Sequence, residues 1–207
     1  MKITVLTLFP GSLASILDAS ILGRARAAGI VEVRAIDMRD FSTNKHRTVD
    51  DSPAGGGAGM VLRADVVKGA LDSVRDPAAP GTRTILVDAR GKPFSQADAR
   101  RFAREAHLCI VCGRYEGVDA RAEAYVDEIG SLGDFVLTGG ELAALSIVDA
   151  TVRLLPGALG NDASSVHESH GDDGLLEHRQ YTRPIAFDGV KVPAVLSSGN
   201  HRDGDRA

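Results

Sequence analysis

Three segments of this sequence carry the residue types that could bind a small polar ligand. In the first, residues 52–60 read SPAGGGAGM, and four glycines within five positions let the backbone approach a ligand closely. A phosphate-binding P-loop would need Lys and then Ser or Thr after the last glycine, whereas Met60 and Val61 follow here. The segment therefore predicts a surface loop or a lid. The cations and carboxylates of residues 44–51 (NKHRTVDD) favour the lid.

The second segment is CGRYEG, residues 112–117, which comes directly after the apolar run 108–112. Ligands of open α/β sheets bind outside the carboxyl ends of the strands, where the backbone groups of this turn would be available. The alternative is an ordinary strand-to-helix turn that uses glycine for tightness. Cys109 and Cys112 form a CxxC pattern, but three residues apart on a strand they face opposite sides. We therefore expect buried structural thiols rather than a zinc or redox site.

The third segment is SLGDFVLTGGEL, residues 131–142, which predicts a short apolar strand, a double glycine and then a helix. Backbone groups at such a junction can bind the edge of an adenine or hold a carboxylate near the helix N-terminus. The apolar residues of that helix share one face until it ends at Pro156. Arg153 lies at the edge of this face. By itself, an arginine near a helix end is usually a solvated charge.

The elements that must position these segments alternate along the chain. Apolar, β-rich runs predict strands at 3–8, 31–36, 84–87 and 108–112. Helical periodicity predicts helices at 13–27, 63–74 and 95–105, the last with Ser95 as its N-cap. Residues 38–59 have no usable period, and loops of this length are usually functional or disordered. The alternation predicts an α/β domain with a mostly parallel sheet and helices on both faces.

Composition limits the classes of function. The chain has 207 residues, of which 43% are hydrophobic, enough to bury a core without disulfides or metals. A net charge of -4 excludes a polycation that holds nucleic acid by charge alone, and 4% aromatic residues without tryptophan exclude a base-stacking platform. No apolar run approaches the ~20 residues of a membrane span, and no signal-peptide pattern is present. Two cysteines in such a chain predict a reducing cytoplasm.

Taken together, these segments resemble the bacterial tRNA (guanine-N1)-methyltransferase family, TrmD, of the SPOUT superfamily. The matching stretches follow the family's order across nearly the whole chain, and that order is more specific than any one motif. They are KHRTVDD at 45–51, GGGAGM at 55–60, CGRYEG at 112–117, SLGDFVLTGGEL at 131–142, LLPGALGN at 154–161, DGLLEHRQYTRP at 173–184 and VPAVLSSGNH at 192–201.

The resemblance implies a SPOUT-type α/β fold with a C-terminal trefoil knot, and a homodimer in which the active sites are shared between subunits. It implies a methyltransferase domain over residues 1–160, followed by an interdomain linker and tail over residues 161–207. The family carries a further basic tRNA-binding module after the SGNH segment. We expect this chain to lack that module and to bind tRNA weakly.

The resemblance also implies the ligands. S-adenosylmethionine would be bound by three loops, which on this chain contain Leu86, Val87, Ala89, Gly113, Tyr115, Glu116, Gly117, Leu132, Gly133, Asp134, Phe135, Val136, Leu137, Gly139 and Gly140. The substrate would be the guanine 3′ of the anticodon, in the anticodon stem-loop of tRNA, contacted by Asp50, Gly56, Gly57 and Gly59. Family members are reported to need magnesium, but no cluster of ligating residues in the sequence predicts a metal site.

The chemistry of this reaction fits two further residues. Guanine N1 carries a proton at neutral pH, so its attack on a sulfonium methyl group needs a general base. Negative charge then develops toward O6, which a guanidinium can stabilise. On the resemblance, the arginine is Arg153 and the base is Glu168. The family uses aspartate as the base, so Asp172 and Asp173 stay open as alternatives.

Other departures leave two alternative functions. The tyrosine that precedes the glycine triplet in the family is Ala54 here, and the family's Pro-Gln-Gly stretch reads Ala89-Arg90-Gly91. These changes, with Glu168, raise the alternative of a knotted dimer that binds the cofactor but no longer methylates. The other alternative is a related SPOUT enzyme with a different RNA target, against which the family-specific run of motifs argues.

Overall fold

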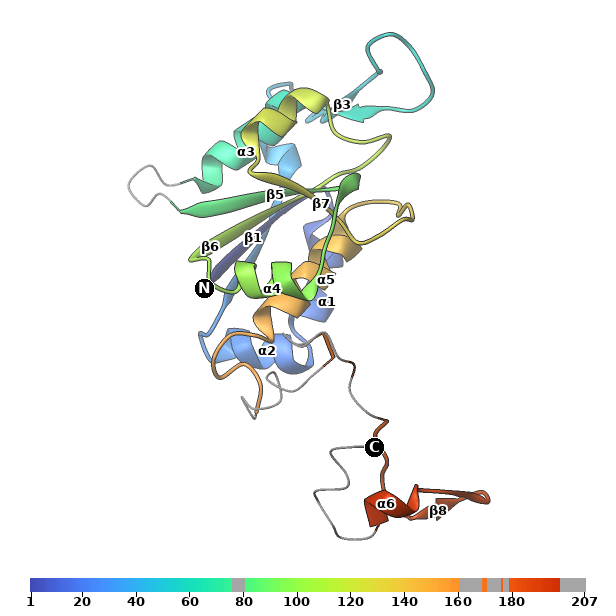
Figure 1. The fold of residues 1–207 in the computed structure, drawn as a ribbon. Helices are drawn as coiled ribbons and strands as arrows, with labels where there is room; N and C mark the ends of the chain where they lie inside the picture. Colours follow the sequence, from blue (N-terminus) through green and yellow to red (C-terminus); the bar gives the residue numbers. More distant parts are fainter. Residues whose placement is uncertain (76–80, 161–168, 171–175, 177–178, 198–207) are drawn as a thin grey trace. The chain divides into compact units, whose positions relative to one another are not determined.

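The structure is a computed structural model that describes residues 1–75, 81–160, 169–170, 176 and 179–197. The chain divides into two compact units, Met1–Ser165 and Val166–Ala207, and each is described by itself. The domain boundary that we expected at residue 160 stays a prediction. The first unit contains the main sheet and its helices (Figure 1).

Five strands form this sheet, in the order β2-β1-β6-β5-β7. Every neighbouring pair is parallel, as predicted. Their bounds are β1 Lys2–Thr7, β2 Glu32–Asp37, β5 Thr82–Pro93, β6 His107–Cys112 and β7 Glu128–Ser131. All five carboxyl ends therefore meet at one edge of the sheet, and the loops that follow them lie together.

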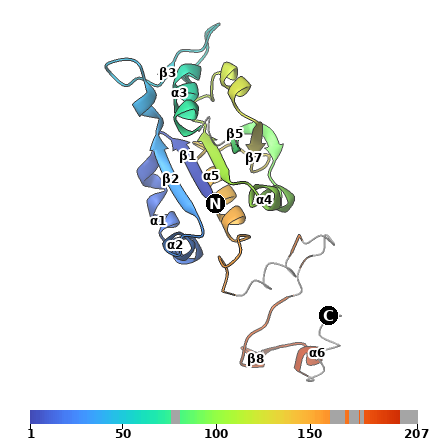
Figure 2. The ribbon, with the colours of Figure 1, turned by 90° about the vertical axis from the view of Figure 1, so that its left-hand side faces the viewer.

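Both faces of the sheet are covered, also as predicted (Figure 2). One face packs against α1 Ala14–Leu17, α2 Ser20–Ala27, α4 Gln96–Phe102 and α5 Glu141–Val152. The other packs against α3 Ala64–Val74 and the 3₁₀ segments η2 Met38–Phe41 and η3 Ala120–Tyr125. Cys112 belongs to the core on the first face and Cys109 to the core on the second, so the prediction that they face opposite sides is confirmed.

Two sequence predictions of local structure are wrong. The helix expected over residues 13–27 is broken, because Ala19 is extended at φ -94° and Ser20 has a positive φ of 48°. A 3₁₀ turn, η1 Pro10–Ser12, precedes the two short helices. The apolar strand expected before the double glycine is a loop, in which the Val136 side chain is 85% exposed. The strand is instead β7, which ends at Ser131.

Local signals explain the boundaries of other elements. Ser95 caps α4 as predicted, in a reciprocal capping box with Asp98. Strand β5 continues beyond the predicted 84–87 and is irregular between Val87 and Lys92. At this irregularity a Cβ on Gly91 would lie 2.6 Å from the backbone of Gly130, so only glycine allows the close approach.

The glycine-rich loop connects the two strands of a short antiparallel pair. These strands are β3 Asp50–Asp51 and β4 Val61–Leu62. The second unit contains another antiparallel pair, β8 Ala186–Phe187 and β9 Val190–Lys191, followed by α6 Ala194–Ser197. Among the helices of the described residues, none combines the length and the apolar character needed to cross a lipid bilayer.

Candidate functional site

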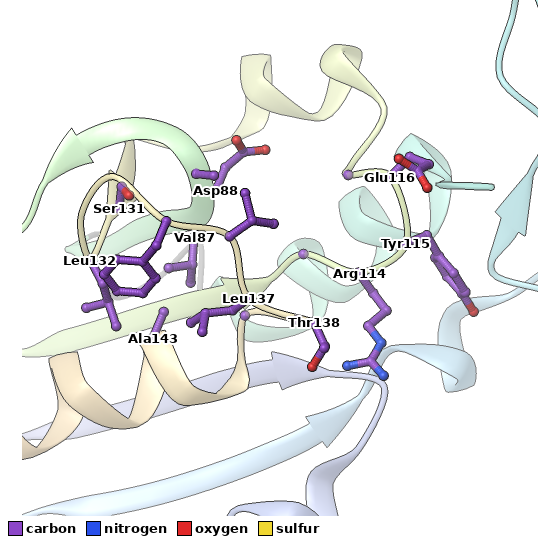
Figure 3. Close-up of a pocket in the computed structure, with 17 residues that line it drawn as sticks. Val87, Asp88, Arg114, Tyr115, Glu116, Ser131, Leu132, Leu137, Thr138 and Ala143 are labelled. Carbon is purple, nitrogen blue, oxygen red and sulfur yellow. The ribbon is translucent and has the colours of Figure 1, made fainter. Parts of the chain in front are cut away.

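A pocket of about 160 Å³ lies at the carboxyl ends of β6 and β7, beside the irregular stretch of β5 (Figure 3). This is the edge at which ligands bind in open α/β sheets. Its lining comes from the irregular stretch of β5, from the loops that follow β6 and β7, and from the first turn of α5. The lining residues are Val87, Asp88, Ala89, Gly113, Arg114, Tyr115, Glu116, Gly117, Ser131, Leu132, Phe135, Val136, Leu137, Thr138, Gly139, Gly140 and Ala143.

The structure brings most of the predicted cofactor residues together. Those that line the pocket are Val87, Ala89, Gly113, Tyr115, Glu116, Gly117, Leu132, Phe135, Val136, Leu137, Gly139 and Gly140. Leu86 does not, because it points from β5 into the core on the opposite face of the sheet. Gly133 and Asp134 belong to the loop after β7 but are not part of the lining.

Sequence reasoning missed some residues of the lining, namely Asp88, Arg114, Ser131, Thr138 and Ala143. Arg114 and Asp88 adjoin residues that were predicted, and their charge was the signal that could have found them. The pocket has two different sides in Figure 3. Val87, Leu132, Leu137 and Ala143 gather on one side, and Arg114 and Tyr115 point away from this apolar group. The pocket can thus accept a ligand with both an apolar and a polar part.

The double glycine closes the floor of the pocket through backbone contacts. Gly140 N–H donates to Gly113 O at 2.9 Å, which joins the start of α5 to the end of β6. A Cβ on Gly140 would lie 2.8 Å from Cys112 Cα and 2.9 Å from Gly113 N. Any side chain here would force the two backbones apart. The physical requirement for glycine is therefore close packing.

A polar network ties the same junction to β1. Glu141, the first residue of α5, accepts a hydrogen bond from Thr7 Oγ1 at 2.7 Å and lies 3.7 Å from Arg114 Nη1. A carboxylate in the first turn of a helix is favourable because of the helix dipole. Burial, and secondarily the charge of Glu141, raises the pKa of the Cys112 thiol well above its ordinary value. Cys112 is thus a buried thiol, as predicted for a structural cysteine.

The glycine-rich loop is joined to the pocket at its base. Glu116 N–H donates to Met60 O and Leu62 N–H donates to Gly117 O, both at 2.9 Å. A Cβ on Gly59 would lie 2.4 Å from Glu116 Cγ, so Gly59 packs directly against a residue of the lining.

The other predicted substrate residues differ in their surroundings. A Cβ on Gly56 would meet nothing within 4 Å, and one on Gly57 only the Pro53 ring at 4.0 Å. Burial, and secondarily the charge of Asp50, raises the pKa of Tyr115, so Asp50 lies near the pocket. Gly59 and Asp50 thus lie beside the pocket.

The lining on the β5 side carries an ionised carboxylate. Burial raises the pKa of Asp88, but hydrogen bonds from the side chain and backbone of Arg90 outweigh it and hold the pKa below its ordinary value. Arg90 donates to both oxygens of Asp88, at 3.0 and 3.2 Å, and also to Glu123 on η3 at 3.0 Å. In the described part of the chain, no group of three or more His, Cys, Asp or Glu gathers to hold a metal ion.

Of the two predicted catalytic residues, only Arg153 is described by the structure, and it is not part of this lining. Arg153 caps the C-terminus of α5, and its position ten residues after Ala143 places it about 15 Å from the pocket along the helix axis. Glu168 and the alternatives Asp172 and Asp173 lie outside the described residues. The roles of Arg153 and Glu168 remain predictions.

A glycine-lined pocket at the carboxyl edge of a parallel sheet is typical of α/β proteins that bind a nucleotide-like ligand. Comparison with known sequences narrows this class. The family model described as tRNA (Guanine-1)-methyltransferase TrmD matches residues 1–206, and the chain belongs to this family. The resemblance seen in the sequence is therefore confirmed.

Curated relatives agree with this assignment, and each carries the name tRNA (guanine-N(1)-)-methyltransferase. The protein of Geobacillus kaustophilus is 52% identical over 204 residues, which are 98% of this chain and 82% of the relative. That of Myxococcus xanthus is 53% identical over 200 residues, 96% of this chain and 80% of the relative. That of Enterococcus faecalis is 50% identical over 203 residues, with 98% and 82% covered.

Proposed function

We propose that this chain transfers a methyl group from S-adenosylmethionine to N1 of the guanine 3′ of the anticodon in tRNA. Membership of a tRNA (guanine-1)-methyltransferase family supports the reaction and the substrate. The observation that carries the proposal for this chain is the pocket, which collects predicted residues from three loops far apart in sequence. Because tRNA is the proposed substrate, we expect the protein to act in the cytoplasm.

The chemistry of the pocket fits this cofactor. Leu132, Phe135 and Leu137 offer an apolar wall for an adenine ring and the methylene groups of the methionine part. The Glu116 carboxylate is available to a cationic group, and the close backbone packing at Gly140 forms the floor on which a ligand would lie. When bound, S-adenosylmethionine supplies an electrophilic methyl group on a sulfonium centre. The protein's part is to position that group, exclude water and remove a proton.

Two residues of the chain would act on the guanine, one on its N1 proton and one on the charge that develops at O6. Glu168 would take the N1 proton of guanine as its general base. Arg153 would stabilise the negative charge that develops toward O6. Since Arg153 lies about 15 Å from the pocket of its own chain, we propose that it acts on the pocket of a second copy. The proposal therefore includes a homodimer with shared sites, and the SPOUT-type trefoil knot.

Methyl transfer tests the reaction directly. The chain is expected to move labelled methyl to an anticodon stem-loop with guanine 3′ of the anticodon, and not to one with adenine there. Glu168→Gln should abolish turnover while the Kd for S-adenosylmethionine stays within about twofold, because a general base does not hold the cofactor. Glu116→Gln, within the lining, should instead weaken cofactor binding. Turnover that survives Glu168→Gln would move the base to Asp172 or Asp173.

Complementation tests the shared site. The Arg153→Ala and Gly140→Ala variants are each expected to be inactive, one through its arginine and one through its pocket. A mixed dimer of the two contains one intact pocket that faces one intact arginine, so mixing should restore activity. If each site belonged to a single chain, mixing would restore none.

The two alternatives predict other results. A binding module would bind S-adenosylmethionine by calorimetry and transfer no methyl to any RNA. An enzyme with another target would methylate RNA at a different nucleotide, which mapping of the labelled product would reveal. The names of the relatives favour the proposed guanine in tRNA.

A further inference from the structure

Three side chains from neighbouring strand ends meet beside the pocket. Phe9 follows β1, Arg39 follows β2 within η2, and Arg114 follows β6. The guanidinium carbon of Arg39 lies 5.3 Å from the centroid of the Phe9 ring, and that of Arg114 lies 4.7 Å from it. The two guanidinium carbons are thus no more than about 10 Å apart. We call Arg39 and Arg114 the arginine pair.

The arginine pair lies at the point of the sheet where the connections of neighbouring strands diverge. Strands β1 and β6 are neighbours, but the chain after β1 packs on one face through α1 and α2, and the chain after β6 packs on the other through η3. Such a divergence opens a crevice at the carboxyl ends of adjacent strands, where ligands bind. Arg114 also lines the pocket, whereas Arg39 and Phe9 do not. The pair therefore extends from the wall of the pocket toward β2.

The guanidinium groups of the pair keep donors available. Among the described residues, Arg114 makes no side-chain hydrogen bond, and its ion pair with Glu141 is 3.7 Å long. Arg39 donates to Leu8 O and lies 3.6 Å from Asp37. Each guanidinium has five N–H donors, so most of them are uncommitted.

Other arginines of the chain are bound differently. Arg101 donates to both oxygens of Glu128, at 2.8 and 2.7 Å, and Arg63 to both oxygens of Asp65, at 3.0 and 2.6 Å. These forks are occupied by the protein's own carboxylates. The contrast indicates that the arginine pair is held in place by an aromatic ring while its donors remain open to a ligand.

We propose that the arginine pair binds the phosphodiester backbone of the RNA strand whose base enters the pocket. This inference rests on the proposed function. Guanidinium groups bind phosphate oxygens bidentately, and they are weakly hydrated enough to pack on an aromatic ring. A base that enters the pocket leaves its backbone at the mouth, where Arg114 lies. Because the net charge of the chain is -4, its attraction for RNA must come from such local groups.

Arg39 is the residue to test, because it contacts the ring and not the pocket. For Arg39→Gln we expect RNA affinity, from direct binding and from the KM for RNA, to fall about 5- to 10-fold at 0.1 M salt. The slope of log affinity against log salt should become shallower by about 0.7 to 0.9, the loss of one phosphate contact. The Kd for S-adenosylmethionine should not change. Arg39→Lys should keep most of the salt slope, since the charge remains.

Arg34→Gln is the matched control. Arg34 lies in β2, is 63% exposed at its side chain, and pairs with Glu32. The substitution removes the same charge five residues earlier, in the strand that precedes η2, so its salt slope should equal that of the parent. Phe9→Leu is the second test variant, because it removes the ring that holds both guanidinium groups and keeps an apolar side chain. Its slope should fall as for Arg39→Gln, with the folded state checked by urea unfolding.

A single neutral linkage in the RNA identifies the phosphate. A stem-loop with one methylphosphonate next to the target guanine should bind the parent about as weakly as the unmodified RNA binds Arg39→Gln. Combining both changes should add little, because they remove the same contact. Inorganic phosphate at constant ionic strength should compete with RNA for the parent only weakly. Strong competition would assign the pair to free phosphate and overturn the RNA assignment.

The outcomes separate this inference from the proposed function. If the parent transfers methyl and Arg39→Gln shows the same salt slope as Arg34→Gln, the phosphate site is wrong and the function stands. If the parent binds RNA with an Arg39-dependent slope but transfers no methyl, the phosphate site stands and the function is wrong. If it neither binds RNA nor transfers methyl, both are wrong.

Discussion

The two ends of the parallel sheet are built in opposite ways. At the amino end, His107 of β6 joins three strands, because its Nε2 lies 2.9 Å from Thr4 Oγ1 and its Nδ1 lies 3.0 Å from Thr82 Oγ1. Both ring nitrogens are therefore engaged within the protein. At the carboxyl end, Arg114 is left with open donors, and Val136 is 85% exposed. At the amino end the polar groups bond to one another within the protein, whereas at the carboxyl end they stay accessible to a ligand.

This difference follows from parallel topology. In a parallel sheet every carboxyl end lies on the same edge, so the loops that bind a ligand gather there and the opposite edge is free to be stabilised. Unsatisfied donors and exposed apolar groups cost stability, so they are expected where a ligand compensates for them. The comparison predicts that substitutions at the carboxyl end change ligand binding, and that those at the amino end change stability alone.

The largest effect is expected at Gly140, where a substitution should change both stability and ligand binding. Gly140→Ala should lower the free energy of unfolding by about 1–3 kcal/mol, because the new Cβ would lie 2.8 Å from Cys112 Cα. It should also weaken S-adenosylmethionine binding at least about tenfold, since the same contact forms the pocket floor. Denaturant unfolding and calorimetry measure the two effects.

Gly11→Ala is the control for Gly140→Ala. A Cβ on Gly11 would meet nothing within 4 Å, so neither stability nor binding should change by more than about 0.5 kcal/mol. The Gly140 backbone has φ -80°, which alanine also adopts, so any loss reports the contact and not backbone strain. Unchanged binding in a stable Gly140→Ala variant would show that the backbone contact at Gly140 does not shape the cofactor pocket.

A medium effect on binding alone is expected from Arg90. Arg90→Ala removes the side-chain donors to Asp88 and Glu123, so the pKa of Asp88 should rise and the β5 side of the pocket should loosen. We expect S-adenosylmethionine to bind about 3- to 10-fold more weakly, and stability to change by less than about 1 kcal/mol, because the side chain is exposed. Calorimetry and urea unfolding check the two values.

Arg121→Ala is the matched control for Arg90→Ala. Arg121 forms the same kind of ion pair with Asp119, and Asp119, unlike Asp88, does not line the pocket. Equal losses of cofactor affinity in both variants would mean that any lost surface charge weakens binding. The pairing of Arg90 with Asp88 would then have no specific part in cofactor binding.

The smallest effect is expected at the amino end and depends on pH. Burial, and secondarily the charge of Lys2, lowers the pKa of His107 from its ordinary 6.5. The unfolded state then binds more protons than the folded state below about pH 6.5, so stability is full above that pH and falls as pH decreases toward the lower folded pKa. In His107→Gln this part of the pH dependence should be absent.

Urea unfolding at pH 7.5 and 5.5 measures the His107 contribution as the difference between parent and variant. Cofactor affinity at pH 7.5 should be the same in both proteins, because His107 lies at the far end of β6 from the pocket. An affinity that changes with His107→Gln would contradict the separation of the two ends.

Residues with strong local signals were predictable from sequence. Ser95 was predicted as a helix cap because serine at the start of a helical segment is a preferred N-cap, and the structure adds the reciprocal capping box with Asp98. The opposite faces of Cys109 and Cys112 follow from the period of a strand. The break at Ala19 was missed because the helical spacing of apolar residues continues through it. The loop 135–137 was mistaken for a strand because apolar residues that face a ligand look like core residues.

The candidate site was predictable only through its motifs. Glycine runs and their order identified the loops that form the pocket, but Asp88 and Arg114 were not among the predicted cofactor residues, although they adjoin them. Arg153 sits at the expected helix end, yet a sequence does not state how far that end lies from the pocket. Distances between loops depend on the register and order of strands, which are long-range properties.

By itself the sequence determined the α/β class, the parallel sheet and the family, because periodicity and motif order are carried by neighbouring residues. Only the tertiary structure decided that Arg39 and Arg114, 75 positions apart, lie on the ring of Phe9. The physical reason is strand order. Placing β1 between β2 and β6 brings three unrelated loops to one edge, and no local pattern encodes that adjacency.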